Sequence, residues 1–131
     1  MHYTIAPSSD GKYIVLTCKG EINRAIAMRQ NREGHSLGKE LGINRYLVDA
    51  TGARNTDTIK DSYNFAYADV RNTSDIDKTA VVALLVSPVD HSHDFIETVA
   101  RNTGLNVTQF TERRLAGSFL GNECLLTIRR S

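Results

Sequence analysis

Two polar stretches of the chain carry the side chains that could do chemistry. Residues 49–52 read Asp-Ala-Thr-Gly after one apolar segment, and residues 90–94 read Asp-His-Ser-His-Asp after another. In α/β proteins, working groups gather where parallel strands end. We therefore weigh four roles for these stretches: a phosphate cradle, a catalytic corner, a regulatory switch and plain turn chemistry.

The second stretch could hold a divalent metal ion through His91 and His93, because imidazole and carboxylate groups are common ligands. At the start of a helix, residues that are two positions apart face nearly opposite directions, so they do not easily share one ion. The alternative is a polar loop, in which Asp90 or Ser92 caps the next helix and Asp94 complements its dipole. We favour this loop and predict no metal site and no cofactor. A metal-dependent enzyme using both histidines is the alternative.

The first stretch lacks the signature of a phosphate cradle. Thr51 and Gly52 belong to neither a G-x-G-x-x-G nor a G-K-[ST] motif. Cys18 lies in a segment typical of a buried strand, which argues against a nucleophilic thiol. No triad and no pair of carboxylates stands out, so we predict that the chain is not an enzyme.

Composition restricts the remaining classes. The chain has 131 residues, which fits one domain, and 16 basic against 15 acidic residues give a net charge of +1. Because basic and acidic residues nearly balance, the chain as a whole has no strong positive charge to attract nucleic acid. We therefore expect no nucleic-acid partner. The apolar run 80–86 is far shorter than the roughly 20 residues of a membrane helix, and the first residues do not resemble a signal peptide. The two cysteines form no disulfide framework, which indicates a cytoplasmic protein with reduced thiols.

Hydrophobic periodicity predicts nine elements in the order β-β-α-β-α-β-α-β-α. The expected strands are 3–5, 13–18, 46–48, 81–86 and 107–110, and the expected helices are 23–41, 59–70, 95–100 and 115–120. Strands that alternate with helices require a largely parallel sheet with right-handed crossovers. A turn at 8–11 joins the first two strands into an antiparallel hairpin at one edge.

Several boundaries follow from single residues. The expected buried stripe of the first helix consists of Ile26, Leu37 and Leu41. Gly34 and Gly38 are expected to weaken this helix, and Gly42 to cap its C-terminus. We expect the strand at 46–48 to end at Asp49 and to turn through residues 51–52. Gly121 is expected to stop the last helix and leave 121–131 as a C-terminal extension, which adds an edge strand or covers a neighbour.

The order of elements resembles the SpoIIAA-like group of the STAS superfamily, the anti-sigma-factor antagonist fold. The matching segments are GKYIVLTCKGEIN, YLVDATG, TAVVALLVSP and FTERRLAGSFL. In that group, a strand ending in Phe and an acidic residue leads into a helix of the form A-x-x-W-L. Ala116, Phe119 and Leu120 occupy those places here, with Phe instead of Trp. The resemblance runs over roughly residues 3 to 120. It implies a single α/β domain over residues 1–131, with a mixed, mostly parallel sheet of about five strands flanked by about four helices.

The resemblance also implies a phosphorylation candidate. Proteins of the group that take part in sigma-factor partner switching carry a D-S-S-G-L box, whose first Ser is phosphorylated by a partner kinase. Residues 57–60 read Asp-Thr-Ile-Lys at the corresponding positions, so Thr58 would take the phosphate, although the second Ser and the Gly-Leu are missing. A phosphate at a helix start would block a partner rather than melt the fold. The alternative is local capping by Thr56, by Asp57, or by Thr58 with Asp61.

The helix predicted at 59–70 carries three aromatic residues within five positions, at Tyr63, Phe65 and Tyr67. The resemblance implies small hydrophobic ligands and membrane association for this region, and ordinary packing against a neighbouring helix is the alternative. We therefore predict a non-enzymatic binding or regulatory module of a bacterial cytoplasm. It would engage a protein partner or a small apolar ligand through residues 51–70, and peripheral membrane association and a homodimer are both compatible with it.

The predicted contact residues are Thr51, Gly52, Thr58, Tyr63, Phe65, Tyr67, His91 and His93. This surface requires that Asp49, Ser87 and Thr111, which follow or end three different strands, lie along one edge of the sheet.

Overall fold

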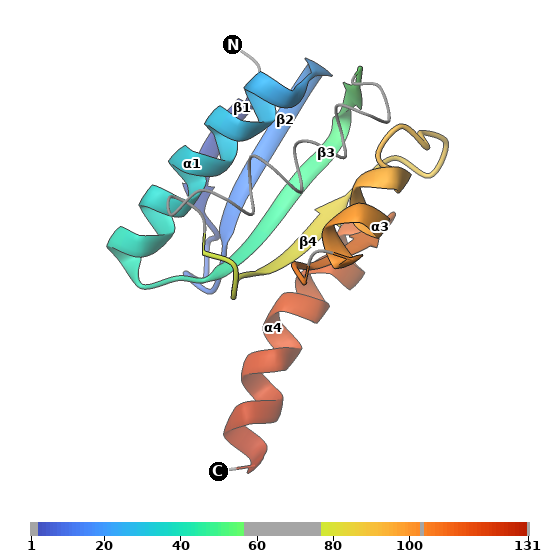
Figure 1. Cartoon of the computed structure of the whole chain (residues 1–131). Coiled ribbons are helices and arrows are strands. Elements are labelled where there is room, and N and C mark those ends of the chain that lie inside the picture. Colours follow the sequence, from blue (N-terminus) through green and yellow to red (C-terminus); the bar gives the residue numbers. More distant parts are fainter. Residues whose placement is uncertain (1–2, 57–76, 103, 131) are drawn as a thin grey trace.

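A computed structural model describes residues 3–56, 77–102 and 104–130 of the chain (Figure 1). The helix predicted at 59–70 lies outside these described residues, and so do four of the predicted contact residues. Those four are Thr58, Tyr63, Phe65 and Tyr67.

Five strands form a single mixed sheet. They are β1 (Tyr3–Pro7), β2 (Ile14–Ile22), β3 (Arg45–Asn55), β4 (Val81–Leu85) and β5 (Asn106–Phe110). Their order in the sheet is β1-β2-β3-β4-β5, with β1 antiparallel to β2 and every other pair parallel. The predicted α/β class, the five strands and the N-terminal hairpin are thereby confirmed.

The hairpin turn forms as its sequence predicts. The Ser8 hydroxyl oxygen accepts the backbone N–H groups of Lys12 and Tyr13, at 3.1 and 3.2 Å. Gly11 has a φ of 72°, the left-handed conformation that glycine adopts without strain. Pro7, which has no N–H to offer, ends the edge strand β1.

The described residues contain three helices: α1 (Arg24–Leu41), α3 (Asp94–Asn102) and α4 (Arg113–Arg130). Right-handed crossovers between parallel strands that neighbour one another in chain order all fall on the same face of a sheet. Helices α1 and α3 lie on that face, and α4 lies behind the sheet (Figure 1). The three layers are therefore helix, sheet and helix.

Alternating strand residues build one core on each side of the sheet. On the α4 side, the fully or nearly fully buried residues are Leu47, Val81, Ala83, Leu85, Ala116 and Leu120. On the α1 side they are Cys18, Ile22, Ala50, Ala53, Leu84 and Val86, with Ile14, Leu16, Tyr46 and Ala80 in an adjoining cluster. The central strands are thus apolar on both faces, as strands between two helical layers must be.

Strand β3 is longer than its sequence predicts, because it does not end at Asp49. Thr17 pairs with Asp49 and Lys19 pairs with Gly52, so β3 holds one extra residue between these pairs. This bulge does not terminate the strand, since the residues after it pair with β2 as far as Ile22 and Asn55. The expected turn through residues 51–52 is therefore a bulge inside a strand.

Helix α4 corrects the expected C-terminal boundary. It continues through Gly121 to Arg130, and its second half extends past the edge of the sheet (Figure 1). Gly121 is not among the glycines with positive φ, so its backbone stays helical. Residues 122–130 are helical rather than an edge strand.

Helix α1 begins and ends as predicted, and its predicted stripe is confirmed in part, because Ile26 and Leu37 are partly buried and pack against the core clusters. The Asn23 side chain accepts the Ile26 N–H at 3.0 Å, and Gly42 closes the helix with a φ of 71°. Leu41, expected in the core, is 47% exposed. The buried residues of α1 are Met28, Gln30, Gly34, His35 and Gly38.

Glycines in the buried stripe bring α1 close to the sheet. A Cβ atom at Gly38 would lie 2.1 Å from the Tyr46 hydroxyl oxygen and 2.6 Å from the Ile43 carbonyl oxygen. One at Gly34 would lie 2.8 Å from a methyl carbon of Leu16. The two glycines therefore permit the packing of α1, and the expectation that they weaken the helix does not describe their role.

We predict that Gly38→Ala destabilises the fold. Overpacking costs about 1 to 3 kcal/mol, and the gain in helix propensity recovers at most about 1 kcal/mol. Urea unfolding should show the net loss. Gly117→Ala in α4 is the matched control, because its Cβ would make an ordinary contact at 3.7 Å with the Tyr13 hydroxyl. Equal stability of the two variants would contradict this account of α1.

His35 joins α1 to β3 and to the segment that enters β4. Its ring stacks on Tyr46 with the ring centroids 4.2 Å apart and the planes 13° from parallel. Its Nδ1 atom accepts the Asp77 N–H at 3.0 Å. Burial lowers the pKa of His35 to about 4, against the raising effect of the Asp77 carboxylate, and the Lys78 ammonium lowers it further. The neutral ring is therefore the form that the fold holds.

This histidine should make the fold sensitive to acid. The pKa of His35 in the folded state lies below the unfolded value of about 6.5. The stabilisation that the neutral ring gives the fold is therefore complete above pH 6.5 and is lost as the pH falls towards 4. The loss should reach roughly 2 to 3 kcal/mol of unfolding free energy near pH 4. His35→Gln should be less stable at pH 7 but show a shallower decline between pH 6.5 and 4. Unfolding curves at several pH values check this, and parallel declines would refute it.

Candidate functional site

The register of the sheet brings Asp49 of β3 level with the ends of β4 and β5 at the carboxyl edge. Asp49 pairs with Leu85, and Leu85 pairs with Phe110. Thr111 follows β5 directly and Ser87 lies two residues after the end of β4, so the predicted gathering at one edge is confirmed. We call residues 49–56, 87–94 and 111–113 the carboxyl rim.

Asp49 fastens the bulge of β3 to the start of α4. Its Oδ1 atom accepts both the N–H and the hydroxyl of Thr51, at 3.1 and 2.7 Å. Its Oδ2 atom accepts a guanidinium N–H of Arg113 at 3.0 Å. The Asp49 side chain is thus committed to positioning Thr51 and α4. Thr51 and its neighbour Gly52 are both exposed on the rim.

Beyond Asp49, β3 has no partner strand on its β4 side among the residues that the structure describes, because the β3–β4 pairing ends at Leu85. Side chains of the loop after β4 fill this place. The Asn55 N–H donates to the Ser92 hydroxyl oxygen at 3.1 Å, and the Asn55 amide donates to the Ser92 carbonyl at 3.2 Å. His93 is only 6% exposed, with Nε2 3.3 Å from the Ala53 carbonyl oxygen. The loop therefore covers a sheet edge that would otherwise be open.

The other side chains of this loop hold its own shape. The Asp90 N–H donates to the Ser87 carbonyl at 3.1 Å, and Asp90 Oδ1 accepts the Ser92 N–H at 2.9 Å. These hydrogen bonds from Ser92 lower the pKa of the Asp90 carboxyl, with smaller contributions from His93 and Arg54. Asp90 and Ser92 thus serve the loop and β3, not the helix cap that the sequence suggests.

His91 differs from His93 in both exposure and partner. It is exposed, and its Nδ1 atom lies 3.0 Å from Asp94 Oδ2. Asp94 Oδ1 accepts the side-chain amide of Gln109 at 2.8 Å. The hydrogen bonds from Gln109 and His91 lower the pKa of Asp94, which lies in the first turn of α3 where the helix dipole favours a carboxylate. This role of Asp94 at the helix start is confirmed.

The two histidines consequently do not converge on one point. His91 faces Asp94, whereas Nε2 of His93 faces the Ala53 carbonyl and lies 3.7 Å from Asp90 Oδ2. In the described ranges, no group of three or more His, Cys, Asp or Glu side chains is arranged to hold a metal ion.

Cys18 is buried, as its strand pattern predicts. The Gln30 side-chain amide donates to its sulfur at 2.7 Å. Burial raises the pKa of Cys18 to about 11, which outweighs the lowering effect of Gln30, so the thiol is protonated at neutral pH. Such a thiol is a poor nucleophile.

Val89 is a rim residue that the sequence reasoning missed. It is 86% exposed, beside exposed Pro88, at the tip of the loop that Ser92 and His93 fasten to β3. The signal available in the sequence was a single apolar residue between a proline and an aspartate.

We predict that Ser92→Ala destabilises the fold by about 1 to 2 kcal/mol, because it removes the hydroxyl oxygen that accepts the Asn55 N–H. Urea unfolding measures the loss, and hydrogen exchange of the Asn55 amide should become faster. Ser36→Ala, on the exposed side of α1, should stay within about 0.5 kcal/mol of the unmodified chain. Unchanged exchange at Asn55 would show that the loop does not protect this edge.

Comparison with known proteins agrees with the fold. No protein-family model and no curated protein matches the chain. One solved structure that it resembles is an uncharacterised protein of the DUF3478 family with a SpoIIAA-like fold, from Shewanella loihica PV-4. The identity is 14%, the TM-score is 0.52, and the match covers 92% of this chain and 95% of that one. None of the helices in the described part has the length and apolar character needed to cross a membrane. The chain has a SpoIIAA-like fold.

Proposed function

We propose that the chain is a non-enzymatic binding module that engages a protein partner through its carboxyl rim. The observation that carries this proposal is the exposed Val89 at the tip of a hydrogen-bonded loop. A single exposed apolar residue is ordinary on a protein surface. What supports a role in binding here is the way the loop is held.

The loop is fixed from both sides before any partner arrives. Ser92 and His93 contact β3, and Asp90 closes the turn behind the tip. Association costs less free energy when the contacting segment is already ordered. An apolar tip on such a loop presents Val89 in one position, which suits insertion into a pocket of a partner.

Other exposed residues of the carboxyl rim suit the border of a protein contact. Thr51, Gly52, Arg54 and His91 are exposed on the same rim and offer hydroxyl, backbone, guanidinium and imidazole groups. Protein interfaces commonly place an apolar centre inside such a polar border. In this proposal Thr51, Gly52 and His91 are contact residues, while His93 positions the loop.

The polar groups of the rim support binding over catalysis. Asp49, Asp90, Asp94 and His93 each make contacts that hold a strand, a loop or a helix start. The predictions that concern Thr58 and the aromatic residues of the 59–70 helix fall outside the described residues and stay predictions. The small apolar ligand proposed for that helix stays a prediction with them.

The test places a photo-reactive benzoylphenylalanine at position 89 in the native host. We expect cross-links to a defined protein, identified by mass spectrometry, which includes the case of a second copy of this chain. With that protein purified, Val89→Asp should weaken binding at least about tenfold in titration calorimetry, because a charge would be buried in the contact.

Leu41 supplies the matched control, because it is also a large exposed apolar residue but lies at the end of α1, away from the rim. Leu41→Asp should leave the affinity unchanged, and the probe at position 41 should not capture the same protein. Equal capture from both positions, or equal affinity of both Asp variants, would reject the rim as the contact surface.

A further inference from the structure

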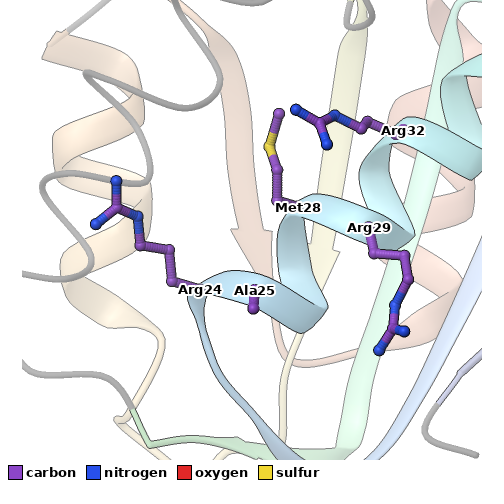
Figure 2. A pocket seen from close by; sticks show the side chains of 5 residues that line it. All are labelled: Arg24, Ala25, Met28, Arg29 and Arg32. Atoms are coloured by element: carbon purple, nitrogen blue, oxygen red, sulfur yellow. The ribbon is translucent and has the colours of Figure 1, made fainter.

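A hollow lies over the first half of α1, on the surface of the molecule and apart from the carboxyl rim. Its volume is about 450 Å³, and its lining residues are Arg24, Ala25, Met28, Arg29 and Arg32 (Figure 2). This volume falls within the range of small-molecule sites, which is about 300 to 1,000 Å³. Among the five described residues that line it, three are arginines and none is acidic.

The spacing of these residues gives the hollow an apolar floor between two cations. Arg24, Met28 and Arg32 are four residues apart and therefore share one stripe of the helix. Met28 is buried, with 7% of its surface exposed. In Figure 2, Arg24 and Arg32 extend on the same side of α1 as Met28, whereas Arg29 points away.

The charge of this stripe is unusual for a helix start. The first turn of α1 contains no acidic residue, although the helix dipole favours one there and disfavours the cation Arg24. The chain as a whole carries a net charge of only +1, so three arginines on one short stretch of helix do not reflect a general positive charge. Arg24 and Arg32 also have partners within the chain, so an incoming anion would compete for them.

We propose that this hollow binds a small anionic amphiphile, with its acidic head group at Arg24 and Arg32 and its apolar stem on Met28. Guanidinium groups donate paired hydrogen bonds to carboxylates and phosphates. The methionine side chain is flexible and polarizable, which suits an apolar stem without a fixed shape. This inference is independent of the proposed function, because the hollow and the rim share no residue.

Titration with sodium decanoate tests the site by following the backbone amide signals of the folded chain in NMR spectra. We expect saturable shifts of the amides of Arg24, Met28 and Arg32, with a submillimolar dissociation constant. Decanol, which has the same stem without the charge, should bind at least tenfold more weakly. Shifts confined to another part of the chain, or equal affinity for the two probes, would overturn the proposal.

Two variants separate the site from general charge effects. Ala25→Glu adds a carboxylate to an exposed position in the hollow and should abolish decanoate binding while the helix start gains a favourable charge. Arg24→Gln with Arg32→Gln should weaken binding at least tenfold. Arg101→Gln with Arg114→Gln changes the net charge equally at exposed positions on α3 and α4, and should leave affinity unchanged. Equal loss in both double variants would show non-specific attraction and overturn the site.

Discussion

One constraint shapes this fold: the four parallel strands lie side by side in the order in which they occur along the chain. Because parallel crossovers are right-handed, the connections between such strands all fall on one face. Leu47, Ala83 and Leu85 on the other face would then meet water, and α4 covers them among the described elements. This explains why Ala116 and Leu120, although they follow the last strand, are fully buried.

The same constraint determines how the carboxyl rim is used. To cover the second face, α4 must begin at the end of β5, which lies level with Asp49 in the register of the sheet. Arg113 in the first turn of α4 therefore reaches Asp49, and a carboxylate that looks catalytic in the sequence becomes a tie between sheet and helix. Similarly, β3 continues beyond the end of β4, so Ser92 and His93 supply the contacts to β3 that a strand would have made.

The sequence predicts those features that depend on near neighbours. The helix end at Gly42 and the turn at Ser8 each involve a few consecutive residues, and both are confirmed. Prediction failed where a feature depends on a contact with a residue distant in the chain. The continuation of β3 depends on its pairing with the second half of β2, and the need for Gly34 depends on the Leu16 side chain. Nothing local to those positions reveals either contact.

The candidate site illustrates why contacts, and not residue types, decide between catalysis and binding. A group that transfers protons must change its charge in every cycle. Hydrogen bonds that lower the pKa of Asp90 and Asp94 also hold the loop and α3, so protonation of either carboxylate would weaken both. His93 likewise contacts a backbone carbonyl of β3. The proposed binding at Val89 requires none of these groups to change charge, and the contacts they make keep the loop ordered, which lowers the entropic cost of association.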